Sequence, residues 1–93
     1  MENNSFEWDD EKAESNLRKH SVSFDEGATI FDDPLVSTIF DQRHSVEEQR
    51  FIAIGMSVDG NLLVVSYAER DERFRLISCR KATKAERYDY ENN

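Results

Sequence analysis

The residues of this sequence best suited to chemistry are two histidines and a set of arginines in the second half of the chain. Cleavage of RNA without a metal needs a base for the 2′-hydroxyl, an acid for the departing 5′-oxygen and cations around the phosphorane. A histidine carries protons in either direction near neutral pH. Lys19-His20 is expected at a helix C-terminus, where the helix dipole favours cations. The alternative is that His20 only caps this helix, and His44, in a polar stretch, is interpreted as a surface residue.

Arginine side chains offer forked donors that match the geometry of phosphate. The segment Arg70 to Arg87 carries seven basic residues against three acidic ones. Within it, Arg75 and Arg80 are the strongest candidates for a binding site, because both are expected on a strand beside apolar residues. The alternative is a set of ordinary ion pairs with nearby carboxylates such as Glu86.

Charge is distributed unevenly along the chain. Twelve Lys and Arg against twenty Asp and Glu give a net charge of -8, which by itself argues against a nucleic-acid partner. Residues 1–49 hold four basic and thirteen acidic groups, whereas residues 50–93 hold eight and seven. We therefore expect a site for a polyanion in the second half, with the acidic first half facing away from it.

The composition predicts one small domain over residues 1–93, without a cofactor or a metal. Cys79 is the only cysteine, so it cannot form an internal disulfide, and no His-x-x-x-His pair supports a zinc site. No apolar run is longer than Leu62 to Val65, far short of the roughly 20 residues that cross a bilayer. The N-terminal residues also lack the pattern of an export signal. We expect a cytoplasmic protein with no membrane partner.

The apolar spacing and two capping motifs predict three helices. A first helix is expected from about Asp10 to His20. A second begins at the capping box Ser23 to Glu26 and ends near Asp33, before the only proline. A third begins at another capping box, Thr83 to Glu86.

Four segments with alternating apolar residues lie between the second and third helices. They are Leu35 to Phe40, Arg50 to Val58, Asn61 to Glu69 and Arg73 to Arg80. The order ααββββα predicts an α+β fold, in which two N-terminal helices pack on a four-stranded antiparallel sheet and a third helix ends the chain.

Two turns decide which side chains share a face of this sheet. If Asp59-Gly60 and Asp71-Glu72 are two-residue turns, the helices cover a face made of Ile52, Ile54, Met56, Leu63, Val65, Tyr67, Phe74 and Leu76. The other face then forms a shallow open floor that includes Ala53, Gly55, Arg75 and Cys79. A shift of one residue in either turn exchanges the faces.

Anchored motifs run through nearly the whole chain. The first group is Phe6-Glu7-Trp8-Asp9, Lys12, Asn16 and Lys19-His20-x-Val22-x-Phe24. The second is Asp41-x-Arg43-His44-Ser45, Glu48-x-Arg50 and Ile54-Gly55. The third is Gly60-x-Leu62-Leu63-Val64-Val65, Arg70, Arg75-x-Ile77-Ser78-x-Arg80-x-Ala82 and Glu86-Arg87-x-x-Tyr90. In this order the motifs resemble the BrnT toxin family.

The resemblance implies a RelE/ParE-like fold and a metal-independent endoribonuclease that arrests growth by cutting RNA. It also implies neutralisation by a BrnA-type antitoxin, in a heterotetramer or larger complex that contacts operator DNA only through the antitoxin. The acidic first half is then expected to face a basic antitoxin surface. Four positions depart from the usual family pattern. Ser21 stands where glycine is common, Gln42 where proline is common, Gly27 replaces a better helix former, and Cys79 replaces alanine and is expected to narrow the floor.

Roles for individual residues complete the sequence-based interpretation. Lys19 and His20 are expected to handle protons or phosphate, and Arg70 and Arg80 to stabilise the transferring phosphate. The residues expected to hold the RNA strand are Arg50, Arg75, Lys81 and Lys84. The alternative is a catalytically inactive relative that serves only as an antitoxin-binding co-repressor module, which the acidic balance favours.

Overall fold

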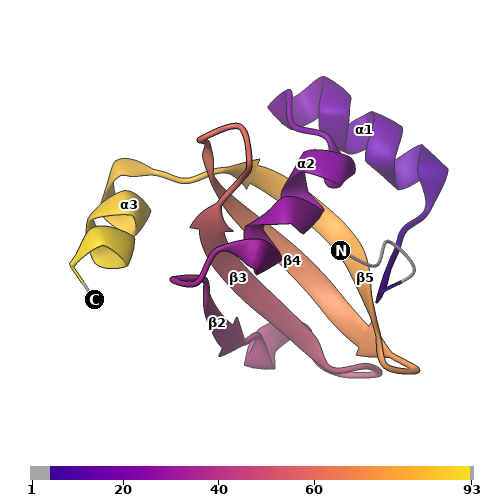
Figure 1. Cartoon of the computed structure of the whole chain (residues 1–93). Helices are drawn as coiled ribbons and strands as arrows, with labels where there is room; N and C mark the ends of the chain where they lie inside the picture. The colour runs from indigo at the N-terminus through magenta and orange to yellow at the C-terminus, as the bar shows by residue number, and fades with distance from the viewer. Residues whose placement is uncertain (1–4, 93) are drawn as a thin grey trace.

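A mixed sheet with two helices on one face forms the body of the protein, and a third helix lies at its side (Figure 1). The computed structural model describes residues 5–92. Its elements are β1 (Phe6–Glu7), α1 (Asp10–His20), α2 (Phe24–Ala28), β2 (Ser37–Phe40), β3 (Arg50–Met56), β4 (Leu62–Arg70), β5 (Arg73–Lys81) and α3 (Lys84–Glu91). Short 3₁₀ turns at Thr29–Asp32 (η2) and Gln42–His44 (η3) complete the chain.

The sheet confirms the α+β class and the predicted antiparallel run of strands, but it has one strand more than expected. Its order is β1-β5-β4-β3-β2. The prediction of a four-stranded RelE/ParE-like sheet is therefore wrong in detail, because Phe6 and Glu7 form β1, which pairs in parallel with β5. A two-residue strand is too short to leave a periodic signal in the sequence.

Both predicted capping boxes begin a helix, but only the second is complete. Thr83 and Glu86 exchange both expected hydrogen bonds at the start of α3. At the start of α2, the Glu26 amide donates to the Ser23 hydroxyl at 3.0 Å as predicted. The Glu26 carboxylate instead accepts hydrogen bonds from the side chains of Ser57, at 2.6 Å, and Asn61, at 2.7 Å. It therefore ties α2 to the turn between β3 and β4.

That turn is one residue longer than predicted, and this exchanges the faces of β3. Met56 pairs with Leu62 and the Ser57 amide donates to the Asn61 carbonyl at 2.8 Å, so Val58, Asp59 and Gly60 form a three-residue loop in which Gly60 has a φ of 83°. Ile52, Ile54 and Met56 therefore lie on the face opposite the first two helices, and not on the covered face as predicted. Ala53 and Gly55 lie on the face covered by the helices, where both are buried. The second turn, Asp71-Glu72, has two residues as predicted, since Arg70 pairs with Arg73.

The hydrophobic core lies between the sheet and the first two helices. Its buried members from the sheet are Ala53, Leu63, Val65, Tyr67, Leu76 and Cys79, and those from the helices and their connections include Val22, Phe24, Ala28 and Ile30. Helix α2 packs closely against β5, since a Cβ atom at Gly27 would lie 2.8 Å from the Cys79 Sγ. Burial raises the pKa of the Cys79 thiol to about 12. The expectation that Cys79 narrows an open floor is wrong, because it lies in this core.

Two polar contacts hold α3 beside the sheet. Arg80 on β5 pairs with Glu86, and the Tyr90 hydroxyl donates a hydrogen bond to the Asp33 carboxylate. Burial opposes ionisation of Asp33, but hydrogen bonds from Tyr90 and from the Met56 amide outweigh it and lower the pKa of Asp33. The same hydrogen bond raises the pKa of Tyr90 to about 12.

Candidate active site

The face of the sheet opposite α1 and α2, here called the open face, carries most of the arginines of the second half of the chain. Side chains alternate between the two faces along each strand. From the observed pairing, the open face receives Arg50 from β3, Arg70 from β4, and Arg73, Arg75 and Arg80 from β5. Glu7 of β1 reaches the same face, because it pairs with Arg75.

One row across the strands places two arginines on either side of a small residue. Arg50 pairs with Ala68, and Ala68 pairs with Arg75. Neighbouring strands lie about 4.8 Å apart, so the Cα atoms of the two arginines are about 10 Å apart. Ala68 is fully buried beneath this row. The row therefore offers two cationic side chains above a low floor.

The far end of the open face is more apolar and is shared with α3. Ile54, Val64 and Arg80 form the corresponding row there. A small cleft of about 200 Å³ lies beside this row and is lined by Ile39, Ile52, Ile54, Val64, Glu86, Asp89 and Tyr90 among others. Arg80 is thus separated from the Arg50 row by the pairing of Ser66 with Ser78.

Most of these arginines already have carboxylate partners. Arg80 makes two 2.8 Å hydrogen bonds to Glu86, which lower the pKa of that carboxyl to about 2. Arg50 binds Glu48 through two nitrogens at 3.1 and 3.2 Å. Arg73 and Arg75 share Glu7, each at 3.6 Å. Within residues 5–92, Arg70 has no ion pair. The alternative of ordinary ion pairs therefore describes much of this face, although Glu7 and Glu48 were not foreseen as partners.

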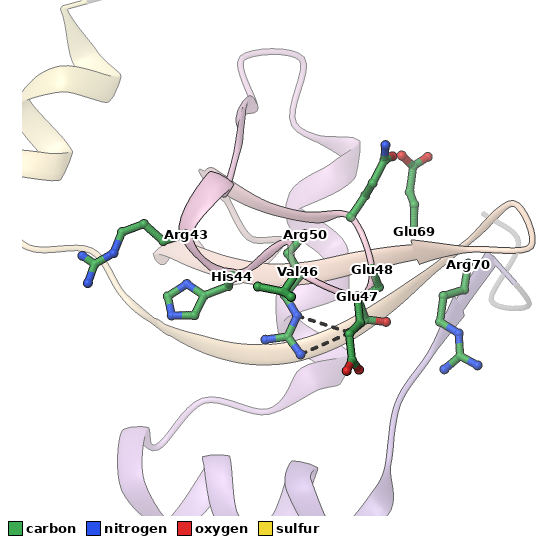
Figure 2. Close-up of a pocket in the computed structure, with 9 residues that line it drawn as sticks. Arg43, His44, Val46, Glu47, Glu48, Arg50, Glu69 and Arg70 are labelled. Atoms are coloured by element: carbon green, nitrogen blue, oxygen red, sulfur yellow. Dashed lines mark hydrogen bonds and ion pairs between the residues drawn. The ribbon is translucent and has the colours of Figure 1, made fainter.

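A polar cleft of about 930 Å³ lies at the Arg50 end of the open face (Figure 2). It is lined by Arg43, His44, Val46, Glu47, Glu48, Gln49, Arg50, Glu69 and Arg70. Two predicted site residues, Arg50 and Arg70, therefore meet in one cleft. Its three arginines are balanced by three glutamates, and a phosphate group that binds Arg50 must displace the Glu48 carboxylate from its guanidinium group.

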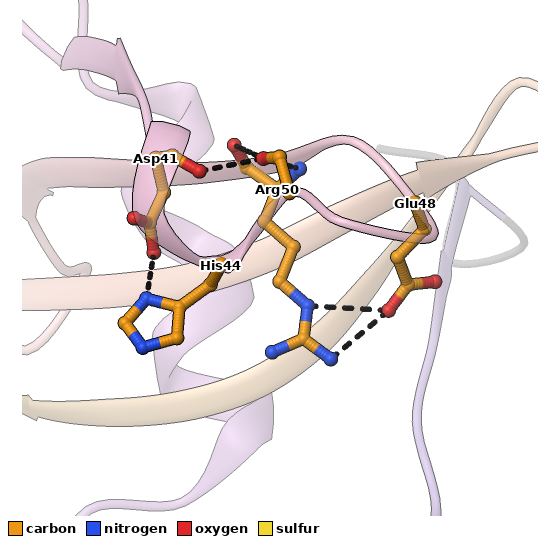
Figure 3. A network of polar contacts seen from close by, with 5 residues as sticks. Asp41, His44, Glu48 and Arg50 are labelled. Atoms are coloured by element: carbon orange, nitrogen blue, oxygen red, sulfur yellow. Dashed lines mark hydrogen bonds and ion pairs between the residues drawn. The ribbon is translucent and has the colours of Figure 1, made fainter.

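His44 is oriented by a carboxylate at the rim of this cleft (Figure 3). Its Nδ1 lies 2.8 Å from the Asp41 Oδ2. The Asp41 amide donates to the Arg50 carbonyl at 2.8 Å, which extends the ladder between β2 and β3. The Arg50 amide donates to the Ser45 hydroxyl at 2.9 Å, and that hydroxyl donates to the Asp41 carbonyl. His44 is exposed as predicted. The sequence signal for its pairing with Asp41 is the Asp41-x-x-His44 spacing, which can place the two side chains in one turn.

The other predicted site residues lie outside this cleft. Lys19 and His20 are exposed in the last turn of α1. Among residues 5–92, no hydrogen bond or ion pair joins either of them to an arginine. Lys81 ends β5 and Lys84 begins α3, and both are exposed. The structure thus brings Arg50 and Arg70 together with His44, and places Arg75 in the same row as Arg50, on the far side of Ala68.

Across residues 5–92, no group of three or more His, Cys, Asp or Glu side chains is arranged to hold a metal ion. No helix within the same range has the length and apolar character required to span a membrane.

The comparisons with known proteins identify the family. A family model described as "Ribonuclease toxin, BrnT, of type II toxin-antitoxin system" matches residues 8–86. The chain belongs to the BrnT family. The members of this family are toxins of type II toxin-antitoxin systems, so an antitoxin protein is the partner that membership implies. No curated protein sequence matches the chain.

The BrnT fold is also found in a solved structure. The chain is similar to the ribonuclease toxin BrnT of Brucella abortus, with a TM-score of 0.67 and 20% sequence identity. The alignment covers 85% of this chain and 96% of the Brucella protein. At this identity the similarity establishes the fold of the chain, including its α+β class.

Proposed function

We propose that this chain is a metal-independent endoribonuclease toxin that arrests growth by cutting RNA and is neutralised by a BrnA-type antitoxin. The observation that carries this proposal is the gathering of five arginines on the open face, although the whole chain has a net charge of -8. RNA binding depends on neutralisation of phosphate charge, and the arginines of the open face supply positive charge for it. Membership of the BrnT family supports the same activity.

RNA is proposed to bind by exchanging protein carboxylates for its own phosphates. Arg50, Arg73 and Arg75 are each within 3.6 Å of a glutamate. Partly exposed pairs of this kind contribute about 0 to 1 kcal/mol each, so their rupture costs little compared with several phosphate contacts. Arg50 and Arg75 then hold the strand, and Arg70, which needs no such exchange, contacts the transferring phosphate.

The remaining predicted residues act outside the polar cleft in this proposal. Arg80 stabilises phosphate only after release from Glu86, and Lys81 and Lys84 extend the cationic surface beyond it. Lys19 and His20 remain candidates for proton or phosphate handling from the end of α1. The antitoxin binds the toxin in a cytoplasmic heterotetramer or larger complex, which contacts operator DNA through the antitoxin alone.

The activity is tested by incubating the purified full chain with single-stranded RNA in EDTA, with and without its antitoxin. Cleavage in EDTA that the antitoxin abolishes is the expected result, and intact RNA in both reactions would refute the proposal.

The binding surface is tested with charge-matched substitutions. Arg50→Gln and Arg75→Gln should each weaken binding of RNA and reduce the salt dependence of log K by about 0.7 per lost phosphate contact. Arg18→Gln is the matched control, since Arg18 lies in α1 with a 72% exposed side chain and forms a long ion pair with Glu14, at 3.9 Å. Equal effects of all three substitutions would show that the open face is not the RNA-binding surface.

Glu48→Gln provides a test in the opposite direction. It frees the Arg50 guanidinium from its carboxylate partner, so binding of RNA should become tighter. Glu14→Gln changes the net charge equally at an exposed site on α1 and should have a smaller effect. Identical gains from both variants would assign the effect to net charge alone.

The ion pairs of the open face favour a second candidate function. A catalytically inactive relative that only binds the antitoxin and assists repression has no need of free arginines, and Arg80 makes two hydrogen bonds to Glu86. Inducible expression distinguishes the two: growth arrest with RNA fragments supports the nuclease, and normal growth with repression of the operon supports the co-repressor.

A further inference from the structure

We propose that His44, oriented by Asp41, is the catalytic residue that accepts the proton of the RNA 2′-hydroxyl. This assignment rests on the proposed ribonuclease function and places its chemistry in the polar cleft at the Arg50 end of the open face. It moves the proton-transfer role away from His20, which the sequence favours on the basis of helix position.

The geometry of the pair fits this role. The Asp41 Oδ2 binds the His44 Nδ1 at 2.8 Å, which holds the imidazole in one orientation. The Asp41 side chain is only 14% exposed, whereas that of His44 is 63% exposed. A carboxylate held inside and an imidazole facing outward leave Nε2 directed away from Asp41, as Figure 3 shows. Nε2 is therefore the atom that can meet a substrate.

Backbone contacts give the pair a rigid support next to a phosphate-binding group. The main chains of Asp41 and Arg50 are joined by a 2.8 Å hydrogen bond. The Ser45 hydroxyl bridges the same two residues, accepting from the Arg50 amide and donating to the Asp41 carbonyl. Three strand ends meet here, because the Glu69 amide of β4 also donates to the Gln49 carbonyl. A proton acceptor, Arg50 and Arg70 thus line one cleft.

The proposed step is a transesterification. The His44 Nε2 takes the proton of the 2′-hydroxyl while the 2′-oxygen forms a bond to the adjacent phosphorus. The bond between phosphorus and the 5′-oxygen breaks, and that oxygen takes a proton from water. The products are a 2′,3′-cyclic phosphate and a 5′-hydroxyl, and the proton on Nε2 returns to solvent. Arg50 and Arg70 stabilise the negative charge of the phosphorane.

The two histidines differ in what surrounds them. His20 is exposed at the end of α1 and, among the described residues, has no carboxylate bound to its ring. His44 has a carboxylate partner, a position in a fixed turn and two arginines in the same cleft. A base needs both orientation and a nearby phosphate, and only His44 has them together.

The test compares His44→Gln, Asp41→Asn, His20→Gln and the control Arg18→Gln in the full chain. Cleavage of single-stranded RNA in EDTA gives kcat and KM, and affinity is measured with the same RNA carrying uncleavable 2′-O-methyl groups. His44→Gln should lower kcat by about 10²- to 10⁴-fold without changing affinity. Asp41→Asn, as a positioning change, should lower kcat by up to about 10⁴-fold at constant KM. Thermal melting checks that each variant is folded.

Three results would overturn the assignment, and each is distinct. If the parent chain leaves RNA intact, the proposed function itself fails before any variant is compared. If His44→Gln cleaves at the parental rate while His20→Gln does not, the proton carrier is His20. If His44→Gln loses affinity for 2′-O-methyl RNA in proportion to its loss of cleavage, the imidazole binds RNA rather than moving a proton.

Discussion

Replacement of Asn16 should release α1 from the sheet. Asn16 is only 6% exposed, and its side chain makes three hydrogen bonds. Its amide group donates to the Val22 carbonyl at 3.0 Å and to the Cys79 carbonyl at 2.8 Å, and its Oδ1 accepts from the Cys79 amide at 3.0 Å. The short strand β1 pairs with Phe74 and Arg75 of β5 and does not extend to Cys79. The Asn16 side chain therefore makes the hydrogen bonds to the Cys79 backbone that a neighbouring strand would make.

The expected cost follows from these three contacts. Each buried hydrogen bond contributes about 1 kcal/mol, so Asn16→Ala loses about 3 kcal/mol. Alanine returns about 0.6 kcal/mol through its higher helix propensity, which leaves a net loss of about 2 to 3 kcal/mol. That is a large fraction of the roughly 5 to 15 kcal/mol that stabilises a domain. Asn16→Asp should cost at least as much, because it places a carboxylate oxygen against two carbonyls.

Urea denaturation followed by far-UV circular dichroism measures these losses, with the slope m expected to stay constant. Glu14→Ala is the control on the same helix, since the Glu14 side chain is 76% exposed, and it should change stability by less than about 0.5 kcal/mol. A loss below about 1 kcal/mol for Asn16→Ala would show that water replaces the amide, and would refute the view that this side chain holds α1 in place.

Three further changes give separate tests. Ser21→Gly should stabilise the fold by about 1 kcal/mol in thermal unfolding, because Ser21 has a φ of 58° at the end of α1; no gain would contradict this. Gly27→Ala should destabilise by about 1 to 3 kcal/mol, since its Cβ would lie 2.8 Å from the Cys79 Sγ, and Cys79→Ala should relieve part of that loss. Additive effects would rule out the clash. Arg80 holds the pKa of Glu86 at about 2, below its ordinary 4.5, so the stabilisation exists above pH 4.5 and is lost as the pH falls towards 2. The stability difference between the parent and Glu86→Gln, about 1 kcal/mol for this partly exposed pair, should shrink over that range in acid titrations; a constant difference would contradict it.

Local signals in the sequence predicted the elements, and the errors came from contacts distant in sequence. The helix starts, the order of strands and the Asp71-Glu72 turn follow from capping and turn residues, and all are confirmed. The faces of β3 were assigned wrongly because Asp59-Gly60 fits both a two-residue and a three-residue turn. The Glu26 carboxylate, bound to Ser57 and Asn61, holds the longer form. No local pattern reveals a contact across more than thirty residues.

The sequence indicates which arginines are candidates for the site, but not how these residues are arranged in space. Residue type makes Arg50, Arg70 and Arg75 candidates, and the face that they share follows from strand pairing. The role proposed for His44 was missed because the histidine lies in a polar stretch without apolar periodicity. Its carboxylate partner three residues earlier becomes apparent only when the η3 turn brings the two side chains together.

The close contact between Gly27 and Cys79 limits which pairs of residues these two positions can carry together. The absence of a side chain at position 27 leaves the space next to the Cys79 sulfur free. With a methyl group at position 27, either α2 or the Cys79 side chain would have to shift, because the added Cβ would lie 2.8 Å from the Cys79 Sγ. Homologues that keep a bulkier residue at position 27 are expected to have alanine or glycine opposite it.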